Sequence, residues 1–173
     1  MSDRRRLLKA VKYVSVVAGL ALLYVSLDFM IDVRPAGIHR SYQFSLDRLP
    51  VDSAVILRQD NLSIVVIRRS PEAIKLLRES SGNLQDPNSR SSSQPDNAEN
   101  SLRSIHPEFF VSYAIGTDLG CGLEAIENGL REICSQARYD FAGRALQGAR
   151  RFENLAIPDY NFSNNFNILT IRP

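Results

Sequence analysis

The feature that most constrains the fold is an apolar run close to the N-terminus. Residues 13–27 carry no charged side chain, and the apolar stretch continues past Asp28 to residue 31. A membrane-spanning helix needs about 20 mostly apolar residues, and a charge near the end of such a span reaches the lipid headgroups at modest cost. No small-residue cleavage site follows the run. We therefore expect residues 13–31 to form a permanent, single transmembrane anchor.

The residues that precede this run are basic. Among the first twelve, only Asp3 is acidic, against Arg4, Arg5, Arg6, Lys9 and Lys12. Lys and Arg concentrate on the cytoplasmic side of a span, so we expect residues 1–12 to be cytoplasmic and the chain beyond the anchor to be exported. Arg4 and Arg5 also fit a twin-arginine export signal, which carries folded proteins. An ordinary anchor with basic flanks explains the same residues, and both interpretations stay open here.

Composition excludes several classes of protein. From residue 33 onward there are 16 basic and 16 acidic side chains, and this balance argues against a nucleic-acid-binding face. Two Cys and two His offer few metal ligands and exclude a disulfide-rich scaffold. No Ser/His/Asp or Cys/His set and no glycine-rich phosphate loop is evident, so we expect neither a nucleic-acid partner nor an enzyme active site.

Short strands and turns are predicted for residues 41–173, with residues 32–40 as a linker. Two β-branched runs around a polar turn, at 54–58 and 62–69, indicate a hairpin. Ser70 as a cap and Pro71 at the first helical position predict a short helix. Further strands are expected at 41–47, 109–115, 139–143, 152–157 and 167–171, and the polar residues 80–104 are expected to form a mobile surface loop. Such a pattern is typical of an all-β domain.

The two cysteines raise the central chemical question. Cys121 and Cys134 lie thirteen positions apart, and in an exported domain such a pair usually forms a disulfide, worth about 3 kcal/mol through loop closure. An iron–sulfur cluster is the alternative, since two Cys and two His would make four ligands. The spacing argues against it, because His39 lies beside the anchor and His106 fifteen residues before Cys121.

Ordered motifs along almost the whole chain resemble one known family. After the basic start and the apolar run come IRRSPE at 67–72, RSIHPE at 103–108, GTDLGC at 116–121 and CSQARYD at 134–140. They resemble the Rieske iron–sulfur subunit of bacterial ubiquinol–cytochrome c oxidoreductase. The resemblance implies an antiparallel Rieske-like β-sandwich behind one anchor helix in the bacterial inner membrane. The domain would lie in the periplasm, with residues 116–139 as the cluster-binding region.

The departures from the family pattern are as specific as the matches. In the family, one Cys and one His of each of two boxes hold a [2Fe–2S] cluster, and the second Cys of each box forms a disulfide. The four ligand positions are occupied here by Gly116, Asp118, Glu132 and Ser135, whereas the disulfide positions remain as Cys121 and Cys134. The resemblance therefore predicts a retained disulfide, a degenerate ligand set and no cluster.

Two further expectations concern the altered tip. Asp118 and Glu132 could approach each other near Ser135 and hold a hard cation such as Ca²⁺, or they could be two solvated acids beside Arg131 and Arg138.

The family's proline-rich covering loop is replaced by residues 148–152. Arg150, Arg151 and Phe152 are therefore a candidate contact surface, unless Phe152 turns into the core.

Three functions follow from this comparison. The first is a non-redox accessory or regulatory subunit of the quinol-oxidising complex or of another respiratory assembly, with its anchor beside cytochrome b. The second is an electron-transfer subunit, as the family name implies. The third is a free-standing periplasmic binding module.

Overall fold

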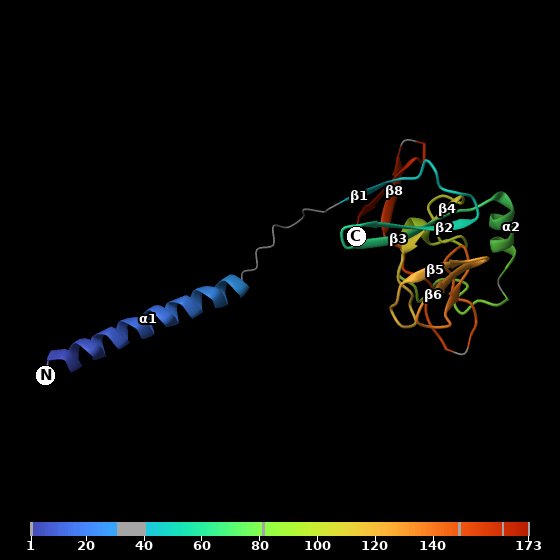
Figure 1. Cartoon of the computed structure of the whole chain (residues 1–173). Coiled ribbons are helices and arrows are strands. Elements are labelled where there is room, and N and C mark those ends of the chain that lie inside the picture. The colour runs from blue at the N-terminus through green and yellow to red at the C-terminus, as the bar shows by residue number, and fades with distance from the viewer. Residues whose placement is uncertain (1, 31–40, 81, 149, 164, 173) are drawn as a thin grey trace. The chain divides into compact units, whose positions relative to one another are not determined.

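The computed structural model describes residues 2–30, 41–80, 82–148, 150–163 and 165–172. The chain divides into an N-terminal helical unit and a β domain (Figure 1). The predicted linker and His39 lie outside the described residues. Within the described residues, nine strands form three antiparallel sheets of three strands each. The all-β domain expected from the sequence is confirmed, and it fits the Rieske-like architecture that the resemblance implies.

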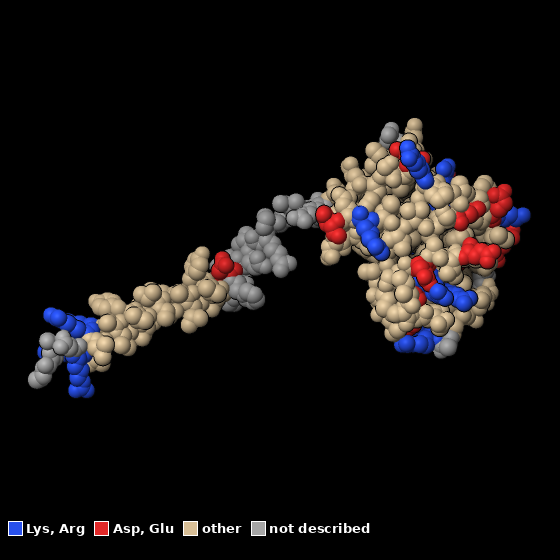
Figure 2. Space-filling model, viewed as in Figure 1, with Lys and Arg blue, Asp and Glu red and all other residues tan. Residues whose placement is uncertain are grey.

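The N-terminal unit is one long helix, α1 (Ser2–Met30). Its stretch Arg4–Asp28 is long and apolar enough to cross a membrane. Basic side chains gather at the N-terminal end, and an uncharged stretch follows them (Figure 2). The predicted apolar helix is therefore confirmed, although it begins about eleven residues earlier than the predicted span.

The central sheet of the domain has the order β2-β3-β4, from β2 (Ser53–Gln59), β3 (Leu62–Arg68) and β4 (Phe109–Tyr113). Strands β2 and β3 form the predicted hairpin, with Val55 opposite Val66. The middle strand is covered on both faces, which explains its unbroken apolar run from Ile64 to Ile67.

The other two sheets flank this core. One has the order β1-β9-β8, from β1 (Tyr42–Ser45), β8 (Asp159–Ser163) and β9 (Ile168–Arg172). The other has the order β5-β6-β7, from β5 (Leu123–Ile126), β6 (Gly129–Glu132) and β7 (Arg138–Tyr139). The second of these sheets carries the two loops that the sequence identifies as a degenerate cluster-binding region.

The short helix α2 (Pro71–Glu79) follows β3 as predicted. The Ser70 hydroxyl accepts a hydrogen bond from the backbone N–H of Ala73 at 3.1 Å, and Pro71 occupies the first turn, where no N–H partner is needed.

The motifs at 67–72 and 103–108 each contribute a buried arginine. Arg69 donates to the Leu102 carbonyl and the Ser104 hydroxyl, and Arg103 donates to the carbonyls of Gly143 and Leu155. Burial lowers the pKa of each guanidinium to about 10, so both remain charged at neutral pH. These two motifs are therefore structural: they bring peptide carbonyls from distant segments to one place.

Two predictions about strands are wrong. Residues 140–143 form a turn after β7, in which Ala142 N–H donates to the Asp140 carboxylate. Residues 152–157 form no strand, because the buried side chain of Asn154 binds the peptide groups of Asp86 and Ala145 in place of a ladder.

The described part of residues 80–104 has a fixed local structure. Within it Leu84, Ala98 and Leu102 are buried, and a 3-10 turn, η1 (Asp96–Ala98), leads into Arg103. The Asp86 carboxylate accepts from the N–H groups of residues 90 and 91, which gives the polar stretch a fixed local structure. The segment therefore covers part of the core with a few buried side chains, while most of its described residues lie at the surface.

Candidate functional site

The site lies where two loops at one end of the β5-β6-β7 sheet run side by side. The first loop, residues 116–121, closes on itself through Gly116 N–H, which donates to the Cys121 carbonyl at 2.7 Å. The second, residues 132–137, closes through Glu132 N–H, which donates to the Ala137 carbonyl at 3.0 Å. Between them Ile133 N–H donates to the Gly122 carbonyl. These backbone hydrogen bonds fix the position of each loop relative to the other.

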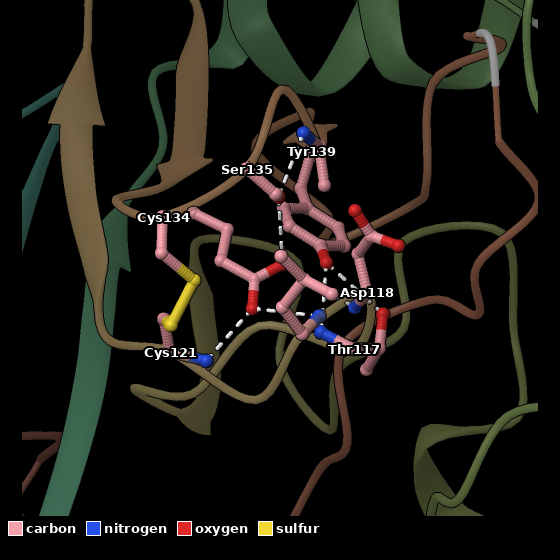
Figure 3. The surroundings of a disulfide bond; sticks show 9 residues. Thr117, Asp118, Cys121, Cys134, Ser135 and Tyr139 are labelled. Carbon is pink, nitrogen blue, oxygen red and sulfur yellow. Dashed lines mark hydrogen bonds between the residues drawn. A yellow bond between two sulfur atoms is a disulfide. The ribbon is translucent and has the colours of Figure 1, made fainter.

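A disulfide joins the two loops, as predicted. Cys121 and Cys134 are bonded, with their Cα atoms 6.1 Å apart (Figure 3). The described part of the chain holds no free cysteine. Cys134 is exposed and Cys121 is half-buried, so a small reductant can reach the bond.

The carboxylate of Glu132 lies at the centre of the site, and the side chain is 0% exposed. Four donors from the two loops converge on it: Cys121 N at 2.7 Å, Leu119 N at 3.0 Å, Ser135 Oγ at 3.0 Å and Asp118 N at 3.3 Å. Burial by itself raises the pKa of a carboxyl group, but these hydrogen bonds together hold the pKa of Glu132 below its ordinary value. Glu132 is therefore an ionised, buried side chain, and its hydrogen-bond partners among the described residues are neutral N–H and O–H donors.

Gly116 makes room for this carboxylate. A Cβ atom at position 116 would lie 2.6 Å from Cγ and 2.7 Å from Oε2 of Glu132, closer than real side chains approach. Any residue other than glycine at 116 would therefore displace the carboxylate or shift the loop. Two positions that the resemblance identifies as ligand positions are, in this chain, fitted to each other.

Asp118 points to a different partner. Its carboxylate lies 3.4 Å from the guanidinium of Arg150, whereas only its backbone N–H faces Glu132. The two carboxylates therefore do not form the predicted pair, and a cation between them would face N–H donors. The alternative of two solvated acids does not describe Glu132 either, because its carboxylate is buried and hydrogen-bonded. Arg131, its candidate ion partner, pairs with Glu124.

The side chain of Tyr139 binds the first loop at Thr117. Its hydroxyl accepts from Thr117 N–H at 2.8 Å and lies 3.0 Å from the Thr117 hydroxyl (Figure 3). Burial raises the pKa of Tyr139, so the phenol stays protonated at neutral pH.

The side chains at the site do not match the donor set of a [2Fe–2S] cluster, which takes Cys or Cys plus His. The carboxylate of Glu132 and both sulfurs lie within 4.8 Å of one another, but the sulfurs are bonded to each other and offer no thiolate. His106 lies elsewhere, with its ring tilted by 40° against that of Phe166 and the two centroids 4.3 Å apart. Glu132 thus occupies the position at which the resemblance would put a cluster ligand.

The residues of the candidate contact surface differ in their exposure to solvent. Arg150 and Arg151 are exposed, whereas Phe152 is 9% exposed and packs edge-on against Tyr139. Arg150 and Phe152 line one side of a pocket of about 320 Å³ beside the disulfide, with Leu119 and Ala137 among the other lining residues.

Sequence reasoning missed an apolar surface around the disulfide. Ile115, Leu119 and Ile133 are 51%, 51% and 63% exposed. Ile115 and Ile133 both pair with Gly122, next to Cys121, and Leu119 lines the same pocket as Cys134. We call these three residues the apolar tip. Exposed apolar groups gathered at one place are typical of an interaction surface.

Comparison with known proteins agrees with the motifs. No protein-family model matches the chain. The ubiquinol–cytochrome c reductase iron–sulfur subunit of Allochromatium vinosum is 29% identical over 182 residues, covering 96% of this chain and 87% of that protein. A chain of a solved hyperthermophilic respiratory Complex III is 14% identical, with a TM-score of 0.48 over 92% of this chain and 96% of that one. Over nearly its whole length, this chain is similar to the iron–sulfur subunit of ubiquinol–cytochrome c reductase.

Proposed function

We propose that this chain is a membrane-anchored, Rieske-like protein without a [2Fe–2S] cluster, and that it is a non-redox accessory subunit of the ubiquinol–cytochrome c oxidoreductase or of another respiratory complex. The observation that carries the proposal is the buried carboxylate of Glu132, which fills the space between the two loops and is neither of the ligand types, Cys and His, that hold a [2Fe–2S] cluster. A regulatory role is included in this proposal, because binding without electron transfer can change the assembly or turnover of a complex.

An electron-transfer role has little chemical support. The positions that would supply iron ligands are occupied by Gly116, Asp118, Glu132 and Ser135, and none of these is Cys or His. The two sulfur atoms near the site are consumed in the disulfide. The chain is accordingly proposed to have no catalytic activity of its own.

Association with a membrane complex rests on three features. The relative from Allochromatium vinosum is named as a reductase subunit, and the similarity to it extends through the N-terminal helix. Helix α1 is long and apolar enough to cross the membrane. The apolar tip offers a surface for a partner such as cytochrome b. The basic N-terminus favours a single pass with the helix start in the cytoplasm and the domain in the periplasm.

The test is purification of the tagged full chain from its native membrane in mild detergent, followed by oxidised and reduced visible spectra. We expect haem bands from a co-purified cytochrome and no iron–sulfur signal from this chain. The variant with Leu119→Gln and Ile133→Gln should lose the haem bands. Leu76→Gln, a matched change at an exposed leucine of α2, should keep them.

Two results would contradict the proposal. A colourless wild-type preparation would favour a free-standing binding module. A cluster spectrum that belongs to this chain would favour the electron-transfer subunit.

A further inference from the structure

We propose that loop 116–121 is a built anion-binding site whose resident ligand is the chain's own Glu132 carboxylate, and that emptying it creates a site for a small free carboxylate such as acetate. This goes beyond the proposed function, because it holds whether or not the chain joins a respiratory complex.

The first argument is the direction of the donors. The N–H groups of Asp118, Leu119 and Cys121 all point to one carboxylate, at 2.7 to 3.3 Å. Successive peptide N–H groups that converge in this way form a concave, positively polarised nest that favours an anion. Ser135 Oγ completes the set from the opposite loop at 3.0 Å.

The second argument is the way the loop is held without the carboxylate. Gly116 N–H binds the Cys121 carbonyl, Thr117 N–H binds the Tyr139 hydroxyl, and the disulfide fixes Cys121 to Cys134. None of these contacts uses the carboxylate of Glu132. The nest therefore keeps its shape when that carboxylate is removed, which a site for a free anion requires.

The third argument is the fit between Gly116 and Glu132. The open face of Gly116 is in contact range of Cγ and Oε2 of Glu132, so the two residues form one packed unit. The missing side chain at Gly116 leaves the room that the Glu132 side chain occupies, so a larger residue at 116 is excluded only while Glu132 fills the nest. The carboxylate thus joins the two loops by hydrogen bonds, alongside the covalent link of the disulfide.

The experiment uses the full chain in detergent and the variant Glu132→Ala. The thermal unfolding midpoint is followed by near-ultraviolet circular dichroism, for which tyrosine is a useful signal because the chain has no Trp. We expect Glu132→Ala to lower the midpoint by about 5–10 °C, since buried N–H groups lose their acceptor. Sodium acetate should then raise the midpoint of Glu132→Ala by about 4 °C for each tenfold increase above its Kd, at constant ionic strength.

Two controls separate this effect from general stabilisation by salt. The wild-type chain should not respond to acetate, because its site is filled. Glu124→Ala removes a half-exposed carboxylate of the neighbouring strand β5 and should not respond either. An equal response in all three proteins, or no response in Glu132→Ala, would overturn the proposal.

A double-mutant cycle gives a second, independent result. Gly116→Ala should lower the midpoint of the wild-type chain by about 5 °C, because its methyl group displaces the carboxylate. In the Glu132→Ala background the same change should cost about 1 °C or less. Equal costs in the two backgrounds would show that the residues do not form one unit, and would overturn the proposal. If Glu132→Ala is too unstable alone, all four proteins of the cycle are measured at one sucrose concentration, which stabilises folded states generally.

Discussion

At the scale of single residues, four charged side chains of the described domain are buried. Arg144 pairs with Asp140 at 2.7 Å, whereas the other three have neutral groups as their principal partners. Arg69 and Arg103 are solvated mainly by peptide carbonyls, and Glu132 by peptide N–H groups. A buried charge is tolerated only when hydrogen bonds replace its water. Each of these residues therefore specifies the local path of the chain, because moving a loop would leave a charge without partners.

The lowered pKa of Glu132 predicts how its contribution depends on pH. Because the folded-state pKa lies below the ordinary value of 4.5, the stabilisation is complete above that value and is lost as the pH falls through the folded-state pKa. At pH 7, Glu132→Gln should cost about 1–3 kcal/mol in free energy of unfolding, since an amide leaves part of the nest unpaired. The difference between wild type and variant should shrink below pH 4.5 in urea unfolding.

Glu124→Gln serves as the control in the same titration. Its carboxylate is half-exposed and pairs with Arg131, so the cost should stay below about 1 kcal/mol. A gap for Glu132→Gln that stays constant or widens in acid would contradict the assignment of an ionised, hydrogen-bonded carboxylate.

Arg103→Lys should be far more costly than its conservative appearance suggests. Arg103 reaches Gly143 and Leu155 with different nitrogens and Gln94 with a third, and a lysine ammonium on its narrow stem cannot reproduce this fork. We expect a loss of about 3 kcal/mol or more in urea unfolding, against less than about 0.5 kcal/mol for Arg90→Lys at an exposed position. Equal losses would show that Arg103 acts only through its charge.

At the same scale, the sequence identifies the site but not its arrangement. The motifs predict that positions 116, 118, 132 and 135 belong together and that they no longer supply iron ligands. They do not predict the nest, because its donors are peptide N–H groups, which every residue carries. The only signal was the joint change to the smallest residue at 116 and to a long acid at 132.

At the scale of elements, predictability follows the strength of the local pattern. The β2–β3 hairpin was predicted because β-branched residues surround a polar turn. Strands β5 and β6 were missed because they are four residues long and mix charged with apolar side chains. The strand expected at 152–157 does not form. Its backbone is held by the side chain of Asn154, which hydrogen-bonds the peptide groups of Asp86 and Ala145, and not by a neighbouring strand. The conformation of these short segments depends on hydrogen bonds to distant parts of the chain, which a local sequence pattern does not predict.

The disulfide should stabilise the two loops that it joins, residues 116–121 and 132–137, more than the rest of the domain. Replacing Cys121 and Cys134 together by Ser should lower the free energy of unfolding by about 3 kcal/mol, the value expected for a cross-link between residues 13 positions apart. Amide hydrogen exchange should quicken in residues 116–121 and in β5-β6, and should change little in β2-β3-β4, where pairing is independent of the cross-link. Reduction of the wild-type protein should give the same map. Uniform acceleration across the domain would contradict a local role.

At the scale of the whole molecule, two separate features indicate on which side of the membrane the domain lies. The basic start of α1 favours a cytoplasmic N-terminus, and a disulfide persists only where the environment is oxidising. The redox state of Cys121 and Cys134 therefore reports on which side of the membrane the domain has reached. This gives a direct test of the export signal at Arg4 and Arg5.

We expect both cysteines of the wild-type protein to resist a maleimide-polyethylene glycol reagent in denatured cells, because they are paired. Arg4→Lys with Arg5→Lys keeps the charge but removes the twin-arginine pair, so a folded domain that uses this route should stay in the cytoplasm with both thiols labelled. Arg6→Lys with Lys9→Arg is the matched control and should remain unlabelled. If the Arg4/Arg5 variant is also unlabelled, the basic residues only orient an ordinary anchor. Labelled wild-type protein would contradict the periplasmic orientation itself, since the same two sulfurs are bonded in the folded domain.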